Sequence, residues 1–293
     1  MSAKQKRGVK YNHVILIPTD FSEVCENAIK HGAELAQFLK YKVCILHVTT
    51  PSDTKSKKNI PSDGIPEKKL QHYKNVYEKK YSVVIDPMIR EGSILEIINQ
   101  VALEIKASLM VLGTHGKQGL QHLFGSYALK VVLDSPCPVV VVQKRAFGKG
   151  YHNIVLPVSL DIEPRQTVEW VIGMNRIFKS KVHLFQAHET DPDLKSRLKI
   201  ISLQIIKFFE EKKIPFKIKI AEKSANYSAQ VISYAVENNT DLIMILTMPS
   251  IDVPGFNFSK WDERMMFNVA QIPVMCINPI ELGSSYYDWM MLT

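Results

Sequence analysis

The most distinctive chemical feature of the sequence is a cluster of four glycines within fourteen residues. The segment Gly113–Ser126 reads GTHGKQGLQHLFGS and directly follows the apolar run Leu109–Leu112. Glycine lets the main chain approach a ligand without an intervening Cβ atom, and successive free amides in such a loop form a concave site for anions. The spacing therefore predicts a loop that cradles a phosphate group.

Gly125 and Ser126 are expected to open the next helix, over residues 126–135. The Ser126 hydroxyl and the first unpaired amides of that helix would face the same phosphate, which a helix N-terminus favours. Hydrogen bonds to a charged group contribute about 1.5–3 kcal/mol each, so a few of them predict roughly micromolar to sub-millimolar affinity. A tight strand-to-helix turn is the alternative, although such a turn needs only one or two glycines. The Walker pattern GxxxxGK[ST] and the GxGxxG fingerprint are absent.

A second polar segment, Pro18-Thr19-Asp20-Phe21-Ser22, follows the apolar run Val14–Ile17. The Asp20 carboxylate and the His115 imidazole could act together on a bound phosphate, since histidine titrates near neutral pH. We interpret His115 as a ligand contact instead, because no Ser-His-Asp arrangement, zinc cluster or SGGxDS-type phosphate loop accompanies it. We therefore predict no catalytic residue and no metal site, and slow ATP hydrolysis is kept as a lesser alternative.

An internal repeat indicates which elements position these segments. Four apolar runs of the first half return in the same order in the second half. The matched pairs are 11–20 with 151–161, 42–48 with 181–187, 108–114 with 241–247, and 136–142 with 271–277. The sequence therefore predicts two copies of one domain, residues 1–146 and 150–293, joined by the polar, glycine-bearing stretch 144–150.

Short apolar runs alternate with helical patterns inside each copy. The runs are near-continuously apolar, as in strands buried on both faces, and Ser22 is a suitable N-cap for the first helix. The expected strands of the first copy are 13–18, 42–48, 82–86, 108–113 and 138–143, and its expected helices are 22–39, 67–80, 93–106 and 126–135. In the second copy, 164–179, 192–213 and 225–238 match the first three helices. This alternation predicts an α/β fold with two doubly wound, five-stranded parallel sheets that have helices on both faces.

Both polar segments reach the carboxyl edge of the first predicted sheet, where doubly wound folds bind ligands. Together with His47-Val48 and Pro136-Cys137-Pro138-Val139, they resemble the universal stress protein family, whose ATP-binding members carry the motif G-2x-G-9x-G-[S/T]. The resemblance covers the first half end to end and the second half more weakly. It implies two tandem flavodoxin-like domains, of which the first binds an adenine nucleotide as part of a cytoplasmic stress response.

The resemblance also implies which residues hold the ligand, ATP or AMP with or without Mg²⁺. Asp20 would contact the adenosine, the Val48 main chain would contact the adenine edge, and the glycine segment would hold the ribose and phosphates. The complete expected set is Pro18, Thr19, Asp20, Val48, Gly113, Thr114, His115, Gly116, Gly119, Gly125, Ser126 and Tyr127. One departure is that only eight residues, 117–124, separate Gly116 from Gly125, where the family motif has nine.

The second copy departs further from the motif. Its glycine segment is replaced by 247–259, which contains two prolines and retains only Gly255, and proline removes an amide donor. Asp161 is kept at the end of its first strand. We predict a degenerate copy without a phosphate cradle that mimics one half of a family dimer, with strands 139–142 and 274–277 meeting across a pseudo-twofold axis. Association of two chains into a homodimer is left open.

Composition excludes several other classes of protein. The formal net charge is +8, but the excess is concentrated in the first ten residues and in 55–80, without the aromatic pattern of a nucleic-acid site. No window approaches the ~20 apolar residues that cross a bilayer. The four cysteines stand singly, as is typical of reduced cytoplasmic thiols. We expect no nucleic-acid or membrane partner, and the alternative to nucleotide binding is a ligand-free scaffold that binds another protein.

Overall fold

The computed structural model describes residues 13–50, 64–115, 122–148, 150–160, 164–223, 226–247 and 260–279. The first half contains β1 (Val14–Pro18), α1 (Glu23–Leu39), β2 (Lys42–Thr49), α3 (Ile65–Tyr81), β3 (Ile85–Glu91), α4 (Ile94–Glu104), β4 (Leu109–Gly113), α5 (His122–Leu133) and β5 (Val139–Val142). The second half contains β6 (Asn153–Val158), α6 (Pro164–Phe178), β7 (Lys181–Gln186), α7 (Pro192–Glu211), β8 (Phe216–Ile220), α8 (Tyr227–Glu237), β9 (Leu242–Leu246), α9 (Lys260–Met266) and β10 (Val274–Ile277).

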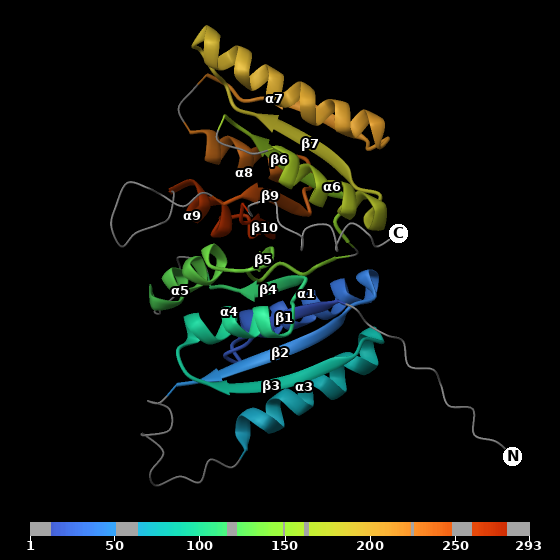
Figure 1. Cartoon of the computed structure of the whole chain (residues 1–293), viewed down its shortest axis with the longest axis vertical. Coiled ribbons are helices and arrows are strands. Elements are labelled where there is room, and N and C mark those ends of the chain that lie inside the picture. The colour runs from blue at the N-terminus through green and yellow to red at the C-terminus, as the bar shows by residue number, and fades with distance from the viewer. Residues whose placement is uncertain are drawn as a thin grey trace, which may run out of the picture.

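The ten strands form one continuous sheet in the order β3-β2-β1-β4-β5-β10-β9-β6-β7-β8 (Figure 1). All pairs inside each half are parallel, as the α/β pattern predicts. The two halves join where β5 pairs with β10 in the antiparallel direction, with Val140 opposite Met275. The expected meeting of the two last strands is therefore present.

Successive strand residues face two apolar cores, one on each side of the sheet. Ile15 and Ile17 of β1 belong to the core beneath α1, α3, α6 and α7, whereas Leu16 belongs to the core beneath α4, α5, α8 and α9. This alternation is the two-residue period of a strand that is buried on both faces. Among the described residues, no helix combines the length and the apolar character needed to span a bilayer. All four cysteines are unpaired and buried.

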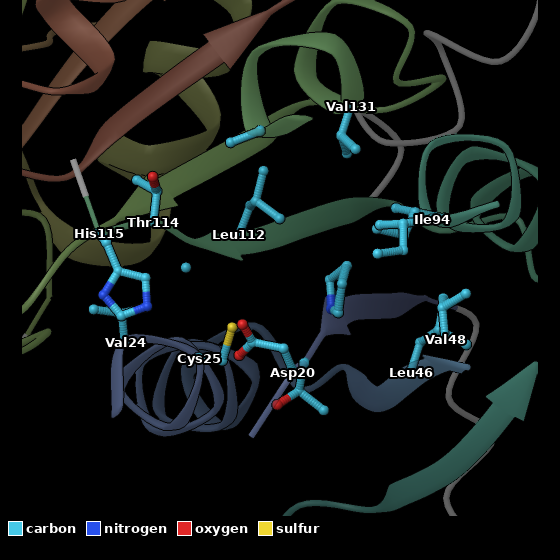
Figure 2. A pocket seen from close by; sticks show the side chains of 15 residues that line it. Asp20, Val24, Cys25, Leu46, Val48, Ile94, Leu112, Thr114, His115 and Val131 are labelled. Atoms are coloured by element: carbon cyan, nitrogen blue, oxygen red, sulfur yellow. The ribbon is translucent and has the colours of Figure 1, made fainter. Parts of the chain in front are cut away.

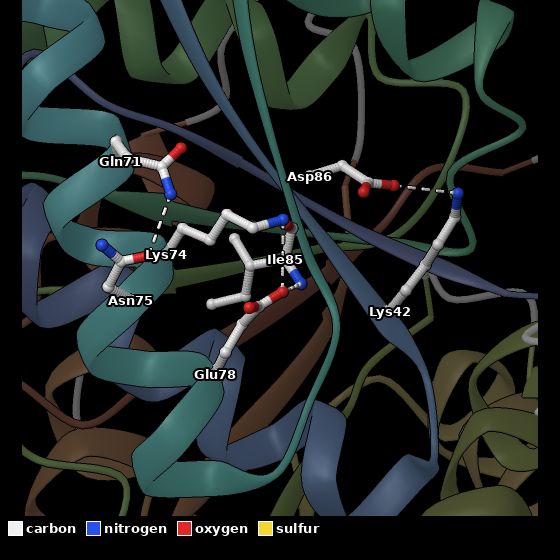
Figure 3. Close-up of polar contacts among 7 residues, drawn as sticks. All are labelled: Lys42, Gln71, Lys74, Asn75, Glu78, Ile85 and Asp86. Carbon is white, nitrogen blue, oxygen red and sulfur yellow. Dashed lines mark hydrogen bonds and ion pairs between the residues drawn. The ribbon is translucent and has the colours of Figure 1, made fainter. Parts of the chain in front are cut away.

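Strand β3 begins later than the predicted 82–86 and extends further, because it lies at the edge of the sheet. Its inner partner is β2, while the main chain of Ile85 is held from α3: Glu78 accepts the Ile85 amide at 2.8 Å, and Lys74 donates to the Ile85 carbonyl at 2.7 Å (Figure 3). Pro87, which cannot donate to a ladder, is tolerated at such an edge. The polar residues of β3 interrupt its apolar positions, so a search for continuous apolar runs does not find its full length.

The stretch that joins the halves has exposed residues, Lys144, Ala146 and Gly148, but it also contains a buried aromatic residue that its polarity does not predict. Phe147 is 5% exposed, and its ring centroid lies 4.7 Å from that of His31 and 5.0 Å from that of Tyr151. The His31 Nε2 atom lies 2.6 Å from the Tyr151 hydroxyl. Because His31 belongs to α1 and Tyr151 precedes β6, this cluster packs the first half against the second.

Candidate functional site

A pocket opens where β1 and β4 separate at their carboxyl ends. The two strands pair at only two positions, Ile15 with Leu109 and Leu16 with Met110, so a crevice forms beyond them at the point where the strand order reverses. The pocket has a cavity volume of about 100 Å³ and opens to solvent at its mouth. It is lined by Pro18, Thr19, Asp20, Val24, Cys25, Leu46, Val48, Ile94, Ile98, Leu112, Gly113, Thr114, His115, Ala128 and Val131.

Most of this lining is apolar, and the polar groups gather in one part of it (Figure 2). Figure 2 shows Ile94 and Val48 at one side of the pocket, with Asp20 near its centre and His115 at the opposite side. Leu112 and Val131 close it from the β4 and α5 side. The pocket therefore offers an apolar slot that leads to a carboxylate and an imidazole.

Asp20 is held in place by a tight turn between β1 and α1. The Phe21 amide donates to the Thr19 hydroxyl at 3.0 Å, and the Ser22 amide donates to the Asp20 carboxylate at 2.8 Å. Ser22 then caps α1 through the Cys25 amide at 3.4 Å, as the sequence predicts. The Asp20 carboxylate is thus held at the start of α1 by a main-chain donor.

The turn includes a non-glycine residue in the left-handed region, since Phe21 has φ of 66°. Its ring is held on two sides: the His47 ring lies 4.4 Å away between centroids, and the Lys69 ammonium lies 5.0 Å above it. His47 in turn donates from Nδ1 to the Thr19 carbonyl at 2.8 Å. Such a conformation persists only when its surroundings enforce it, and it is common beside binding sites.

Electrostatics distinguish the two reactive side chains of the pocket. Burial raises the pKa of Asp20, but hydrogen bonds from Ser22 and Cys25 and the charge of His115 together lower it by more, so the pKa lies below the ordinary aspartate value. Asp20 is therefore an ionised hydrogen-bond acceptor at neutral pH. Burial raises the pKa of the Cys25 thiol to about 12, with the Asp20 charge adding to the effect. Cys25 is consequently a protonated, unreactive wall residue.

The structure gives Gly113 a packing role. A Cβ atom at this position would lie 2.7 Å from the carbonyl oxygen of Val24 and 3.1 Å from the Cα atom of Cys25. Both are main-chain atoms of α1, which no rotamer change can move. The absence of a side chain at Gly113 is thus explained by the close approach of β4 to α1, whether or not a ligand is bound.

The remaining residues of the expected cradle are placed differently. Gly116 and Gly119 lie outside the described residues. Helix α5 begins at His122, four residues before its predicted start, so Gly125, Ser126 and Tyr127 stand inside the helix. The expectation that Ser126 opens it is therefore wrong. Physically, the sequence His122–Phe124 can continue the helical pattern, and glycine inside a helix is only weakly disfavoured.

Seven expected residues line the pocket together: Pro18, Thr19, Asp20, Val48, Gly113, Thr114 and His115. The sequence did not single out the apolar wall. Ile94 and Ile98 come from the first turns of α4, and Ala128 and Val131 come from α5. Their spacings of four and three residues are those of one helix face, but this pattern also describes ordinary core residues.

The equivalent crevice of the second half holds a side chain of the protein itself. The Tyr227 hydroxyl accepts a hydrogen bond from the Val158 amide at 3.1 Å and donates to the Phe185 carbonyl at 2.5 Å. Its ring stacks on Trp261, with centroids 5.2 Å apart. Burial raises the pKa of Tyr227, so the hydroxyl stays protonated. The retained Asp161, and the stretch 248–259 of the segment that replaces the glycines, lie outside the described residues.

Comparison with known proteins identifies close relatives of the first half. The family described as "Universal stress protein family" matches residues 12–143. A universal stress protein of Methanocaldococcus jannaschii is 33% identical over 141 residues, which cover 44% of this chain and 81% of the relative. Universal stress protein G of Salmonella typhimurium is 30% identical over 141 residues, which cover 44% of this chain and 97% of that protein.

The whole chain has a solved structural counterpart. A universal stress protein of Archaeoglobus fulgidus superposes on 90% of this chain and 98% of its own, with a TM-score of 0.66 and 16% identity. At that identity the likeness concerns the fold. It extends to both halves of the chain, since each contributes five strands to the continuous sheet.

Proposed function

The chain belongs to the universal stress protein family, and from this premise we propose that its first half binds an adenine nucleotide, ATP or AMP, between β1 and β4. The observation that carries the proposal is an apolar pocket that ends at an ionised carboxylate, hydrogen-bonded to the start of α1, at the point where the strand order reverses. A purine ring fits such a slot by burying its faces. Ribose hydroxyls are suitable donors to Asp20.

The main chain of β2 supports the choice of a base with a hydrogen-bonding edge. Along β2, the Thr49 carbonyl accepts from the β3 side, whereas the Leu46 carbonyl accepts from Thr19 on the β1 side. Because ladder groups alternate between the two neighbours, the amide and carbonyl of Val48 face the β1 side. The β1·β2 register stops at Pro18 opposite Leu46. Val48 therefore presents one donor and one acceptor to the crevice, the pair that the edge of adenine complements.

The phosphate groups would extend away from Asp20, because two anionic groups repel each other in a partly buried site. The sequence after His115 is the region available to them, with the glycines that can offer main-chain amides. Nucleotide binding in this half would act as the switch of a stress-response regulator, and Mg²⁺ would accompany ATP through its phosphates. The described residues include no group of three or more His, Cys, Asp or Glu side chains that could hold a metal by itself.

Calorimetric titration of the full chain tests the proposal. We expect ATP or AMP to bind with roughly micromolar to sub-millimolar affinity, and GTP, whose base edge has the opposite hydrogen-bond pattern, to bind at least tenfold more weakly. Asp20→Asn should weaken binding, whereas Asp86→Asn on the exposed edge strand serves as the matched control. Absence of heat with every adenine nucleotide, with and without Mg²⁺, would overturn the proposal.

A ligand-independent scaffold is the second candidate function. It is favoured by exposed apolar side chains on the outer elements of the second half, where Ile200 and Leu203 of α7 are 57% and 52% exposed, and Ile218 and Ile220 of β8 are 48% and 53% exposed. This role would leave the melting temperature unchanged when ATP is added. Calorimetric titration and the melting temperature with and without ATP therefore separate the two candidates.

A further inference from the structure

Asn278, the first residue after β10, reaches out of the second half and caps a helix of the first. Its side-chain amide donates to the carbonyls of Val132 at 2.7 Å, Leu133 at 2.9 Å and Ser135 at 3.0 Å. Leu133 is the last residue of α5, and the last carbonyls of a helix have no partner within it. The Val132 carbonyl also accepts from the Ser135 amide at 3.2 Å, so Asn278 adds donors from the other half of the chain to a helix end that its own half caps in part.

The orientation of Asn278 is determined by its own half. The Thr247 hydroxyl donates to the Asn278 side-chain oxygen, and the Thr247 amide donates to the Ile277 carbonyl at 2.9 Å. With the oxygen held by a donor, the amide nitrogen must point at α5. The network therefore assigns both ends of the carboxamide.

The hydrogen bonds that each half donates to a helix end of the other half differ. Gln143, the first residue after β5, occupies the pseudo-equivalent place, and its side-chain amide donates to the Asn268 carbonyl at 3.1 Å, beyond the end of α9. The end of α9 is capped instead from within its own half, because the Asn268 amide donates to the Met265 carbonyl at 3.0 Å and to the Ile272 carbonyl at 2.8 Å. Between these two helices, α5 is the one whose own last carbonyls accept hydrogen bonds from a side chain of the opposite half.

Helix α5 is also a wall of the pocket. Ala128 and Val131 line it, and Val131 immediately precedes the first carbonyl that Asn278 binds. A change in the position of the last turn of α5 would therefore move the pocket wall. The corresponding crevice of the second half is filled by Tyr227, so no such wall has to be held there.

We propose that Asn278 is a positioning residue for the pocket of the first half, and that the second half keeps this pocket preformed by capping α5. This proposal rests on the proposed nucleotide binding for its ligand, but its structural part concerns the unliganded protein. According to this proposal, the second half stabilises α5 of the first half in addition to pairing β10 with β5.

Segment-resolved hydrogen exchange of the full, unliganded chain tests the structural part. In Asn278→Ala we expect amide exchange in the last turns of α5 to accelerate roughly two- to tenfold, the effect of one net hydrogen bond, with β1 and β2 unchanged. Gln143→Ala is the matched control, because it removes the pseudo-equivalent amide and should leave α5 unaffected. Thr247→Val keeps Asn278 but frees its orientation, and should give an intermediate acceleration even if the alanine variant folds poorly.

Nucleotide titration of the same variants tests the functional part at a temperature where all are folded. AMP should bind Asn278→Ala roughly two- to tenfold more weakly than wild type, and Gln143→Ala with wild-type affinity. Equal exchange of α5 in all variants, or equal loss of affinity in the two alanine variants, would overturn the proposal. A wild-type protein that binds no nucleotide would overturn the proposed function instead, and the exchange experiment would still decide the role of Asn278.

Discussion

The packing role of Gly113 can be tested by adding one methyl group. In Gly113→Ala the new Cβ atom would meet the carbonyl oxygen of Val24 at 2.7 Å and its carbonyl carbon at 3.0 Å. Because both atoms belong to the main chain of α1, helix and strand must separate by several tenths of an ångström. Overpacking of this kind costs about 1–3 kcal/mol, and we expect the upper part of that range, since no side chain can rotate away.

Gly32→Ala is the informative control, because the distances alone would rank it as the worse substitution. A Cβ atom at Gly32 would approach the Cδ1 atom of Ile17 even more closely than the one at Gly113 approaches Val24. That contact is with the end of a flexible side chain, however, and alanine gains about 1 kcal/mol over glycine inside a helix. The two terms nearly cancel, so we expect a change in stability of within about 1 kcal/mol.

Urea denaturation of the unliganded proteins distinguishes the two cases. Gly113→Ala should lower the free energy of unfolding by about 2–3 kcal/mol, and Gly32→Ala should change it little. If the glycine served only the approach of a ligand, Gly113→Ala would unfold like wild type and lose affinity alone. That result, or a larger destabilisation by Gly32→Ala, would refute the packing argument.

Three further predictions concern the titratable groups and the filled crevice. The pKa of Asp20 is lowered in the folded state, so the stability it contributes is present above the unfolded value and is lost as pH falls through the folded pKa; Asp20→Asn should show a flatter decline in urea midpoint below pH ~4. Burial lowers the pKa of His31 to about 3, so the protein should lose about 1.4 kcal/mol of stability per pH unit as pH falls below ~6.5. His31→Asn should remove most of that slope between pH 6 and 4 in urea titrations. Tyr227→Phe should destabilise the chain by about 1–3 kcal/mol, because the Val158 amide and the Phe185 carbonyl lose their shared partner, with AMP affinity unchanged in calorimetry.

Apolar runs predicted the central strands well because those strands are buried on both faces. The run 138–143 contains β5 (Val139–Val142), and the repeat predicted its antiparallel partner β10. The edge strand β3 was misplaced by several residues, since polar residues and a proline interrupt its apolar positions and one of its seven residues is fully buried. Phe147 was missed for the opposite reason: it is a single buried residue in a polar stretch, and no periodicity surrounds it.

The candidate site could be predicted at its strand ends and not at its helices. Asp20 and His115 stand two residues after the ends of β1 and β4, and parallel topology alone brings such ends together. The start of α5 could not be predicted in the same way, because glycine and serine can either open a helix or lie within it at small cost. The cap from Asn278 depends on how the two halves meet, which no local pattern encodes.

The fate of the second crevice shows how a single side chain can decide between a pocket and a core. Ile15 pairs with the first residue of β4 and Ile154 with the first residue of β9, so the register makes Thr19 equivalent to Val158. In the first half the Thr19 amide donates directly to the Leu46 carbonyl at 2.8 Å, whereas in the second half the hydroxyl of Tyr227 stands between the corresponding groups.

Tyr227 is the first residue of α8, as Ile94 is of α4. An isoleucine there leaves an apolar wall, since it has no group that can bond to the strand ends. A tyrosine at the same place fills the crevice and satisfies the main chain without a ligand. In the second half, an internal contact of Tyr227 therefore replaces the open crevice of the first half. This arrangement is expected if the second half binds no nucleotide and stabilises the first.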